Sequence, residues 1–209
     1  MKINLGCASE PLSDYINVDM DSLSDIKQRY PHKKFPANII IEQWDIFNLP
    51  VENNSVDEIR ADCLFEHLNF KEEKQIFMEV SRVLKVGGIL NLAVPDAEAF
   101  FKSWLAAEDN WQDWYRDDDE AINDEHWFGT YEYSYKNRWG YLTACLYGSQ
   151  NGEGQYHKNC YTLSKLKNIC KKLNFDIIST ETFKWRHSNN LDDILRIKAI
   201  KKEFLLCQK

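Results

Sequence analysis

Short runs of aliphatic and β-branched residues alternate with longer segments of helical periodicity along most of this chain. Runs of the first kind are typical of strands, and their alternation with helices predicts an α/β fold with a Rossmann-like, mostly parallel sheet. Five strands are expected before residue 97 and two more near the C-terminus. The expected strands are 2–5, 16–19, 39–41, 56–61, 89–94, 175–180 and 194–200.

The strongest helical pattern covers about residues 70–85. Asn69 and Glu72 have the spacing of a capping box at its start, and Gly87 can adopt the left-handed conformation that ends a helix. Only residues 6–15 separate the first two strands, which is barely enough for a crossover helix. We therefore expect a very short helix or a loop at that crossover.

A second helical pattern follows Thr162, whose side chain can cap the first turn. Asn174 can take the left-handed conformation at its end. Between the fifth expected strand and this second helical pattern, residues 97–160 are rich in tryptophan and tyrosine. We interpret 1–209 as one domain with an aromatic-rich helical insertion at about 97–160, after the fifth strand. The insertion could be a substrate lid, a helical subcore or a homodimer contact.

Composition narrows the function classes. The 209 residues carry a formal net charge of -7, which disfavours nucleic acid as a partner, because proteins that grip its backbone present basic surfaces. No stretch is apolar enough to span a membrane, so a cytoplasmic protein is expected. The six cysteines include no CxxC pair, which predicts reduced thiols. His157 and Cys160 have metal-ligand spacing without a second pair, so no metal is predicted.

Candidate ligand-binding residues follow the first three strands. Gly6, Cys7 and Ala8 form a small-residue turn that a ligand could approach closely, although an ordinary tight turn explains it equally well. Asp19 ends the second strand, where a carboxylate can accept hydrogen bonds from ribose hydroxyls or cap a helix. Asp21 is a rival for that role.

The third strand is followed by Trp44, Asp45 and Ile46. Asp45 could accept a hydrogen bond from an adenine amino group while its two neighbours pack on the ring. Two further segments complete the pattern: residues 62–68, DCLFEHL, follow the fourth strand, and residues 82–88, RVLKVGG, precede the fifth.

In this order the segments resemble the class I S-adenosylmethionine-dependent methyltransferases, and most closely a small subgroup often associated with glycan or natural-product biosynthesis. The resemblance implies a seven-stranded sheet whose last strand is antiparallel and lies between its neighbours. It also implies S-adenosyl-L-methionine as the cofactor. The cofactor-binding residues that the resemblance implies are Asn4, Gly6, Cys7, Ala8, Asp19, Met20, Trp44, Asp45, Ile46 and Asp62.

Within that set, the glycine turn would lie beneath the methionine and ribose portions, Asp19 would bind the ribose, Asp45 the adenine, and Asp62 would lie near the methionine end. The chain departs from the family at the first turn. Asn4 replaces the usual acid, and Ala8 and Glu10 replace two glycines. These changes keep open the alternative of a non-catalytic cofactor-binding or scaffold protein.

Three histidines are candidates for the general base that an alcohol acceptor benefits from. His157 lies in a glycine-bearing loop, His67 follows the fourth strand, and His126 lies in the insertion. We predict His157, then His67, as the catalytic base, with a structural role as the alternative for each. The predicted activity is methyl transfer to a hydroxyl group of a small-molecule or sugar acceptor, with amine and carboxylate acceptors as alternatives. A nicotinamide-dependent oxidoreductase is disfavoured because no GxGxxG follows a strand.

Overall fold

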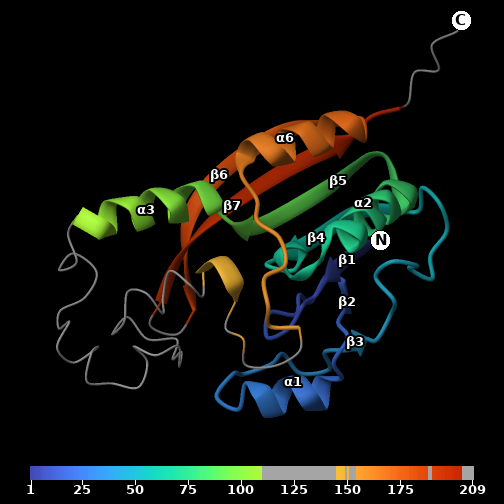
Figure 1. Ribbon diagram of the computed structural model, residues 1–209. Helices are drawn as coiled ribbons and strands as arrows, with labels where there is room; N and C mark the ends of the chain where they lie inside the picture. The colour runs from blue at the N-terminus through green and yellow to red at the C-terminus, as the bar shows by residue number, and fades with distance from the viewer. Residues whose placement is uncertain (110–144, 149, 151–153, 188–189, 204–209) are drawn as a thin grey trace, which may run out of the picture.

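A computed structural model describes residues 1–109, 145–148, 150, 154–187 and 190–203, and its centre is one seven-stranded sheet (Figure 1). The strand order is β3-β2-β1-β4-β5-β7-β6. Strand β7 is antiparallel to both of its neighbours, whereas the other pairings are parallel. The strands are β1 (Lys2–Leu5), β2 (Ile16–Val18), β3 (Ile41–Glu42), β4 (Val56–Asp62), β5 (Leu84–Pro95), β6 (Phe175–His187) and β7 (Asn190–Lys201).

The predicted seven-stranded sheet with an antiparallel last strand between its neighbours is thus confirmed. The sheet is mixed, because β7 runs against β5 and β6, and these three strands are longer than predicted. The helical elements are α1 (Leu23–Arg29), the short 3-10 helix η1 (Phe65–His67), α2 (Phe70–Val83), α3 (Ala97–Asp109) and α6 (Leu163–Lys172).

Helix α2 begins as predicted and ends differently. The Asn69 side chain accepts hydrogen bonds from the backbone of Lys71 and Glu72, and the Glu72 carboxylate accepts one from the Asn69 N–H. The prediction that Gly87 ends this helix is wrong. Leu84 is already extended and pairs with β4, while Gly87 has its φ of 83° within β5.

A lysine from β7 replaces the expected glycine cap. The buried Lys201 ammonium donates to the carbonyls of Ser81 and Leu84, each at 2.7 Å, and to the Asn54 side chain. These carbonyls lie at the C-terminus of α2, where the last turn lacks partners within the helix and favours positive charge. The chain can therefore pass straight from helix into strand.

The crossover between β1 and β2 contains no helix, as the short spacing predicted. Two amides hold its loop on the sheet instead. Asn17 accepts a hydrogen bond from the Leu12 N–H at 2.8 Å and donates to the Leu12 carbonyl at 2.9 Å. Asn4 donates to Asn17 at 3.1 Å and to the Glu10 carbonyl at 3.2 Å. The loop thus satisfies its backbone without helical hydrogen bonds.

Helix α6 confirms the second helical prediction. Thr162 caps it by accepting from the Lys165 N–H, and Asn174 follows it with a φ of 59°. Helix α1, between β2 and β3, was not predicted. Its only buried residue is Ile26, so it lacks the apolar stripe that marks an amphipathic helix, although Ser22 caps it well.

The two faces of the sheet differ in chemistry. Helices α2 and α6 lie over one face (Figure 1), and their apolar residues share a core with alternate residues of β1, β4, β5 and β7. The opposite face is polar. Its side chains include Asn4, Asn17, Glu58, Arg60, Asp62, Asn91 and Arg196. The alternation of Ile197, Lys198 and Ala199 is the sequence signal of this one-sided burial.

The first part of the predicted insertion is helical, because α3 follows β5 directly. Residues 110–144, with most of the aromatic residues and His126, lie outside the described residues, as do the aromatic lid and the homodimer contact predicted there. None of the helices in the described part of the chain has the length and apolar character needed to span a bilayer.

Candidate active site

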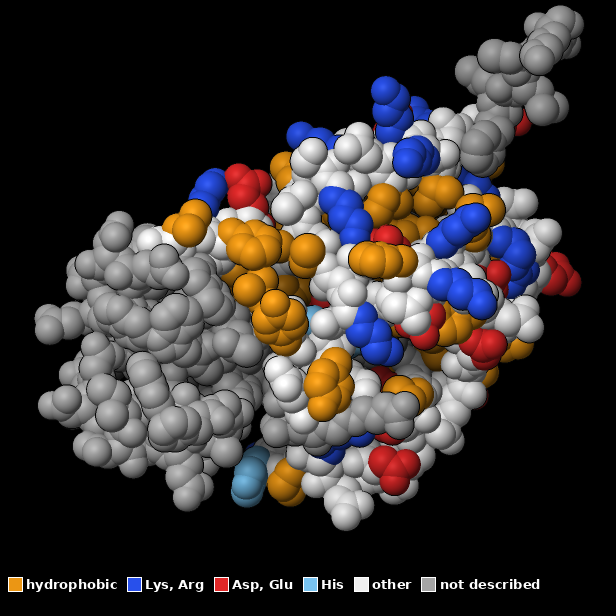
Figure 2. Space-filling model, viewed as in Figure 1, with side chains coloured by type: hydrophobic (Ala, Val, Ile, Leu, Met, Phe, Trp, Pro, Cys, Tyr) orange, Lys and Arg blue, Asp and Glu red, His pale blue; other side chains and the backbone are white. Residues whose placement is uncertain are grey.

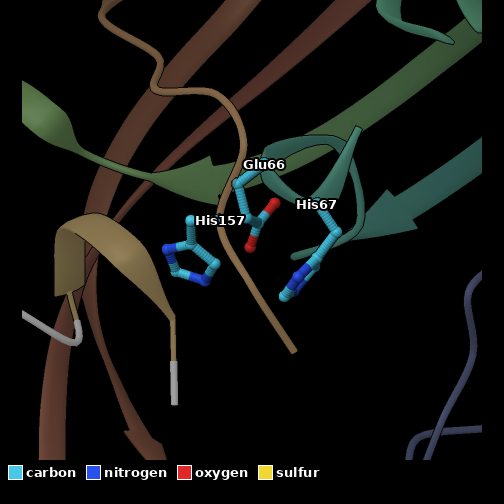
Figure 3. Close-up of side chains that lie close together, drawn as sticks. All are labelled: Glu66, His67 and His157. Atoms are coloured by element: carbon cyan, nitrogen blue, oxygen red, sulfur yellow. The ribbon is translucent and has the colours of Figure 1, made fainter. Parts of the chain in front are cut away.

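Three titratable side chains from distant parts of the chain meet beyond the carboxyl end of β4 (Figure 3). Glu66 and His67 belong to η1, which follows the sharp turn at Cys63, where φ is 52°. His157 comes from the segment of residues 154–160, which leads back to the sheet and is called the returning segment below. One potential ligand atom from each residue lies within 4.8 Å of the other two. The structure thus brings together the two histidines that the sequence predicted as alternatives.

The returning segment is fastened to η1 through its backbone. The Glu66 carbonyl accepts hydrogen bonds from the N–H groups of Lys158 at 2.7 Å and Asn159 at 3.1 Å. Tyr161, which is fully buried, donates its hydroxyl proton to the Phe65 carbonyl at 3.5 Å. Tyr161 also forms a parallel bridge with Asp96, directly after β5. These contacts fix His157 relative to Glu66 and His67.

Both imidazole rings are oriented by main-chain carbonyls. Nδ1 of His67 lies 3.1 Å from the Tyr156 carbonyl oxygen, and Nδ1 of His157 lies 3.0 Å from that of Cys145. A carbonyl oxygen can only accept, so each Nδ1 carries the proton. In the neutral ring, Nε2 then keeps its lone pair. Each ring can therefore accept a proton or bind a metal through Nε2.

The surroundings keep both rings neutral. The pKa of His157 is lowered to about 4, mainly by burial and to a smaller extent by the neighbouring His67. Burial also lowers the pKa of His67 below its usual value, with a smaller contribution from the charge of Lys158. The rings pack edge to face, with centroids 4.9 Å apart at 76°. Such packing would be unfavourable between two imidazolium ions.

A small hollow, open to solvent, lies beside the cluster. Its volume is ≈ 220 Å³, including its opening to solvent, and Glu66 and His157 line it together with apolar residues such as Phe100 and Leu146. On the face shown in Figure 2, large apolar side chains are exposed on α3 and in the neighbouring described residues 145–148 and 154–156. These are Phe101, Leu105, Tyr147 and Tyr156. A ligand with both apolar and hydroxyl groups would suit this combination.

The predicted ribose-binding residue lies at the carboxyl end of β2. Asp19 is 8% exposed, and its two oxygens accept hydrogen bonds from the N–H groups of Ala8 at 2.8 Å and Asp21 at 3.1 Å. A carboxylate has about four acceptor positions, so two N–H contacts leave capacity for hydroxyl donors. Asp21 itself forms an ion pair with Arg29. Asp19 is therefore the better placed of the two rival acids.

The first turn is shaped by two residues with positive φ. Gly6 has a φ of 61°, and a Cβ there would come within 2.9 Å of the Leu64 side chain. Ala8 has a φ of 40°, which the hydrogen bond to Asp19 supports. Cys7 is buried, and burial raises the pKa of its thiol to about 12. The turn is thus compact and chemically inert.

The other residues predicted to bind the donor differ in their burial and in their hydrogen bonds to the rest of the protein. Asn4 is buried and its amide holds the first loop. Met20 is 78% exposed. Trp44 and Ile46 are half-buried against the core, and Asp45 is exposed with one oxygen accepting from the Phe47 N–H at 2.9 Å.

Asp62 lies on the polar face of the sheet between two guanidinium groups. Arg60 donates to it at 2.6 and 2.8 Å, and Arg196 of β7 donates at 3.0 Å across the small Ala93. Its predicted place near the methionine end of the donor stays a prediction. Sequence reasoning missed these arginines and Glu66, although Glu66 lies in the segment that was singled out after the fourth strand.

Residues 4–92 match the family described as Methyltransferase domain. This match confirms the predicted enzyme class. No curated protein matches the chain by sequence.

Solved structures share the fold at low identity. An S-adenosylmethionine-dependent methyltransferase from Methanosarcina mazei superposes with a TM-score of 0.59 and 16% identity, covering 96% of this chain and 92% of its own. A 1,6-didemethyltoxoflavin-N1-methyltransferase from Burkholderia thailandensis, solved with its substrate and S-adenosylhomocysteine, has a TM-score of 0.56 and 11% identity. Here the coverage is 97% of this chain and 71% of the other. The predicted Rossmann-like methyltransferase fold is confirmed, and these similarities agree with the predicted cofactor.

Proposed function

We propose that this protein transfers the methyl group of S-adenosylmethionine to a hydroxyl group of a small molecule or glycan, next to Glu66, His67 and His157. One observation carries the proposal. The two histidines predicted as alternative bases lie side by side on the edge of a methyltransferase sheet, each with Nδ1 bound to a carbonyl and Nε2 able to accept a proton.

The residues at the ends of β2 and β3 suit the nucleoside half of the donor. A ribose needs an acceptor for two hydroxyls, which Asp19 can supply, and the adenine needs apolar contact beside an acceptor, which Trp44, Ile46 and Asp45 can supply. The two strands are direct neighbours in the sheet. The nucleoside would then lie across adjacent strand ends, where α/β folds bind ligands.

The donor supplies a methyl group on a positively charged sulfur, which is displaced in line by the acceptor oxygen. The oxygen–methyl bond forms as the sulfur–methyl bond breaks, and the bonding electron pair stays on sulfur. Nε2 of His157 accepts the hydroxyl proton, since this residue lines the hollow and stays neutral at pH 7. Positioning contributes more than the base, with about 7–11 kcal/mol available from orientation.

A screen of methyl acceptors tests the proposal directly. Purified protein is incubated with methyl-labelled donor and with matched acceptors that present a hydroxyl, an amine or a carboxylate on one scaffold. We expect label on oxygen, with demethylated donor formed in equal amount. Transfer to nitrogen alone would overturn the hydroxyl assignment. Donor binding without transfer to any acceptor would favour the scaffold alternative.

A further inference from the structure

We propose that Glu66, His67 and His157 together form a binding site for one divalent transition-metal ion such as zinc. The inference concerns the side chains on which the proposed function rests, but it goes beyond the assignment of an imidazole as the base. Its starting point is that two imidazole nitrogens and one carboxylate oxygen converge within 4.8 Å of one another. Figure 3 shows the Glu66 carboxylate between the two rings.

The chemistry of the three groups selects the kind of ion. Two imidazoles and one carboxylate are a ligand set typical of zinc and of non-haem iron sites with open positions. Calcium and magnesium favour sites made of oxygen ligands alone. Tetrahedral zinc with bonds of about 2.0–2.1 Å needs ligand atoms roughly 3.3 Å apart. Binding would therefore require the three ligand atoms, which now lie within 4.8 Å of one another, to reach that spacing.

The contacts around the rings are those of a metal site. A histidine ligand usually donates its other ring N–H to a carbonyl or carboxylate, which fixes both its tautomer and its orientation. His67 does so to the Tyr156 carbonyl, and His157 to the Cys145 carbonyl. Both rings are therefore held through Nδ1, and Nε2 is the nitrogen that could bind a metal.

The protein backbone holds the ligands in register without an ion. The Glu66 carbonyl accepts two N–H groups from the residues that directly follow His157. The His157 N–H in turn donates to the Tyr147 carbonyl at 2.9 Å. Preorganisation of this kind lowers the cost of assembling three ligands from segments about ninety residues apart.

A bound ion would give the site a Lewis acid next to the hollow. An acceptor hydroxyl at an open coordination position would have a lowered pKa. Metal binding would use the Nε2 lone pairs, so the ion would replace the free imidazole as the activating group in the metal-loaded protein, whereas His157 is the base in the metal-free protein.

Zinc binding by the full chain provides the test. The protein is treated with chelator, and zinc is titrated by calorimetry, with bound metal counted by elemental analysis. We expect one ion per chain. His67→Gln, His157→Gln and Glu66→Gln should each weaken binding by at least about tenfold. His32→Gln and Glu98→Gln change exposed residues outside the cluster and should bind zinc as the unaltered protein does.

Two further measurements keep the result clear. Cys160→Ser should bind zinc normally, because this exposed thiol borders the hollow but is not among the three ligands. If a ligand variant fails to fold, the cobalt spectrum of the unaltered protein decides: weak visible bands without thiolate-to-cobalt charge transfer are expected. No saturable zinc binding, a thiolate spectrum, or binding that survives loss of either histidine would overturn the proposal. None of these measurements uses donor or acceptor, so their failure is distinct from failure of methyl transfer.

Discussion

The proposed donor-binding edge of the sheet, which we call the donor edge, comprises Asp19 after β2 and residues 44–46 after β3. This edge and the cluster at η1 are built in different ways. At the donor edge, the hydrogen bond between Ala8 and Asp19 joins residues only 11 positions apart. At the cluster, the hydrogen bond between His67 and Tyr156 spans 89 positions. The first region is organised by one loop and two adjacent strands, whereas the second requires residues 156–159 to lie against η1. Substitutions that weaken the contacts between this segment and η1 should therefore affect the cluster and leave donor binding at Asp19 intact.

The largest effect is expected from His157→Gln, which removes the proposed base at the cluster. Single-turnover methyl transfer should fall by about 10²–10⁴-fold, while donor affinity remains within a fewfold of the original. His32→Gln, at an exposed position outside the cluster, serves as the matched control. A rate within a fewfold of the unaltered protein would remove His157 as the base, and His67 would be tested next.

The next largest effect is expected from Asp19→Ala at the donor edge. Loss of a charged acceptor for the ribose should weaken donor binding by about ten- to a hundredfold. Because the N–H groups of Ala8 and Asp21 also lose their acceptor, the free energy of unfolding should decrease by about 1–3 kcal/mol. Calorimetric donor affinity and a denaturation curve measure the two effects. Asp14→Ala, at an exposed position, is the control, and unchanged donor affinity in folded Asp19→Ala would contradict the assignment.

The contrast between the two regions explains what the sequence could predict. Asp19 and the caps at Asn69 and Thr162 depend on neighbours along the chain, so residue type and spacing were sufficient. The seven strands followed from β-branched runs. The first histidine of the cluster also followed from its position after β4.

The proximity of Glu66 and His157 could not be predicted, because no spacing in the sequence relates η1 to the returning segment. Residue spacing in the sequence therefore gave no indication of the cluster of Glu66, His67 and His157. The end of α2 was mispredicted for the same reason, since the cap comes from Lys201 on β7. At this end, a partner 120 positions away does what Gly87 was expected to do.

A smaller effect is expected from Asp45→Asn. This exposed carboxylate keeps an oxygen beyond the one that accepts from the Phe47 N–H, so its loss should change stability little. We expect the unaltered protein to prefer the donor over an analogue that lacks the adenine amino group. The variant should lose most of that preference. Competition binding measures both, and equal discrimination by the two proteins would place the adenine elsewhere.

The smallest expected effect concerns the chemical reactivity of the buried thiols. Burial raises the pKa of Cys7 to about 12 and that of Cys170 to about 11. At pH 8 the thiolate fraction of Cys7 is then about 10⁻⁴, so alkylation followed by mass spectrometry should label exposed Cys160 before Cys7 and Cys170. Fast labelling of Cys7 in folded protein would contradict the compact turn.

The same shift predicts a pH dependence of stability. Folded Cys7 keeps its proton up to about pH 12, whereas an unfolded cysteine loses it near its ordinary value of 9.0. The folded state binds more protons in this window, so the free energy of unfolding should decrease as the pH rises above about 9. Cys7→Ser should show a weaker decrease over the same window, and identical pH dependence in the two proteins would contradict this cause.

Titration of the purified protein with S-adenosylmethionine is the most direct test of the central claim that the donor edge holds this cofactor. We predict saturable calorimetric binding at one site per chain, displacement by S-adenosylhomocysteine, and no competition from a nicotinamide dinucleotide. The absence of saturable binding of S-adenosylmethionine, or stronger binding of the nicotinamide dinucleotide at the same site, would contradict the claim.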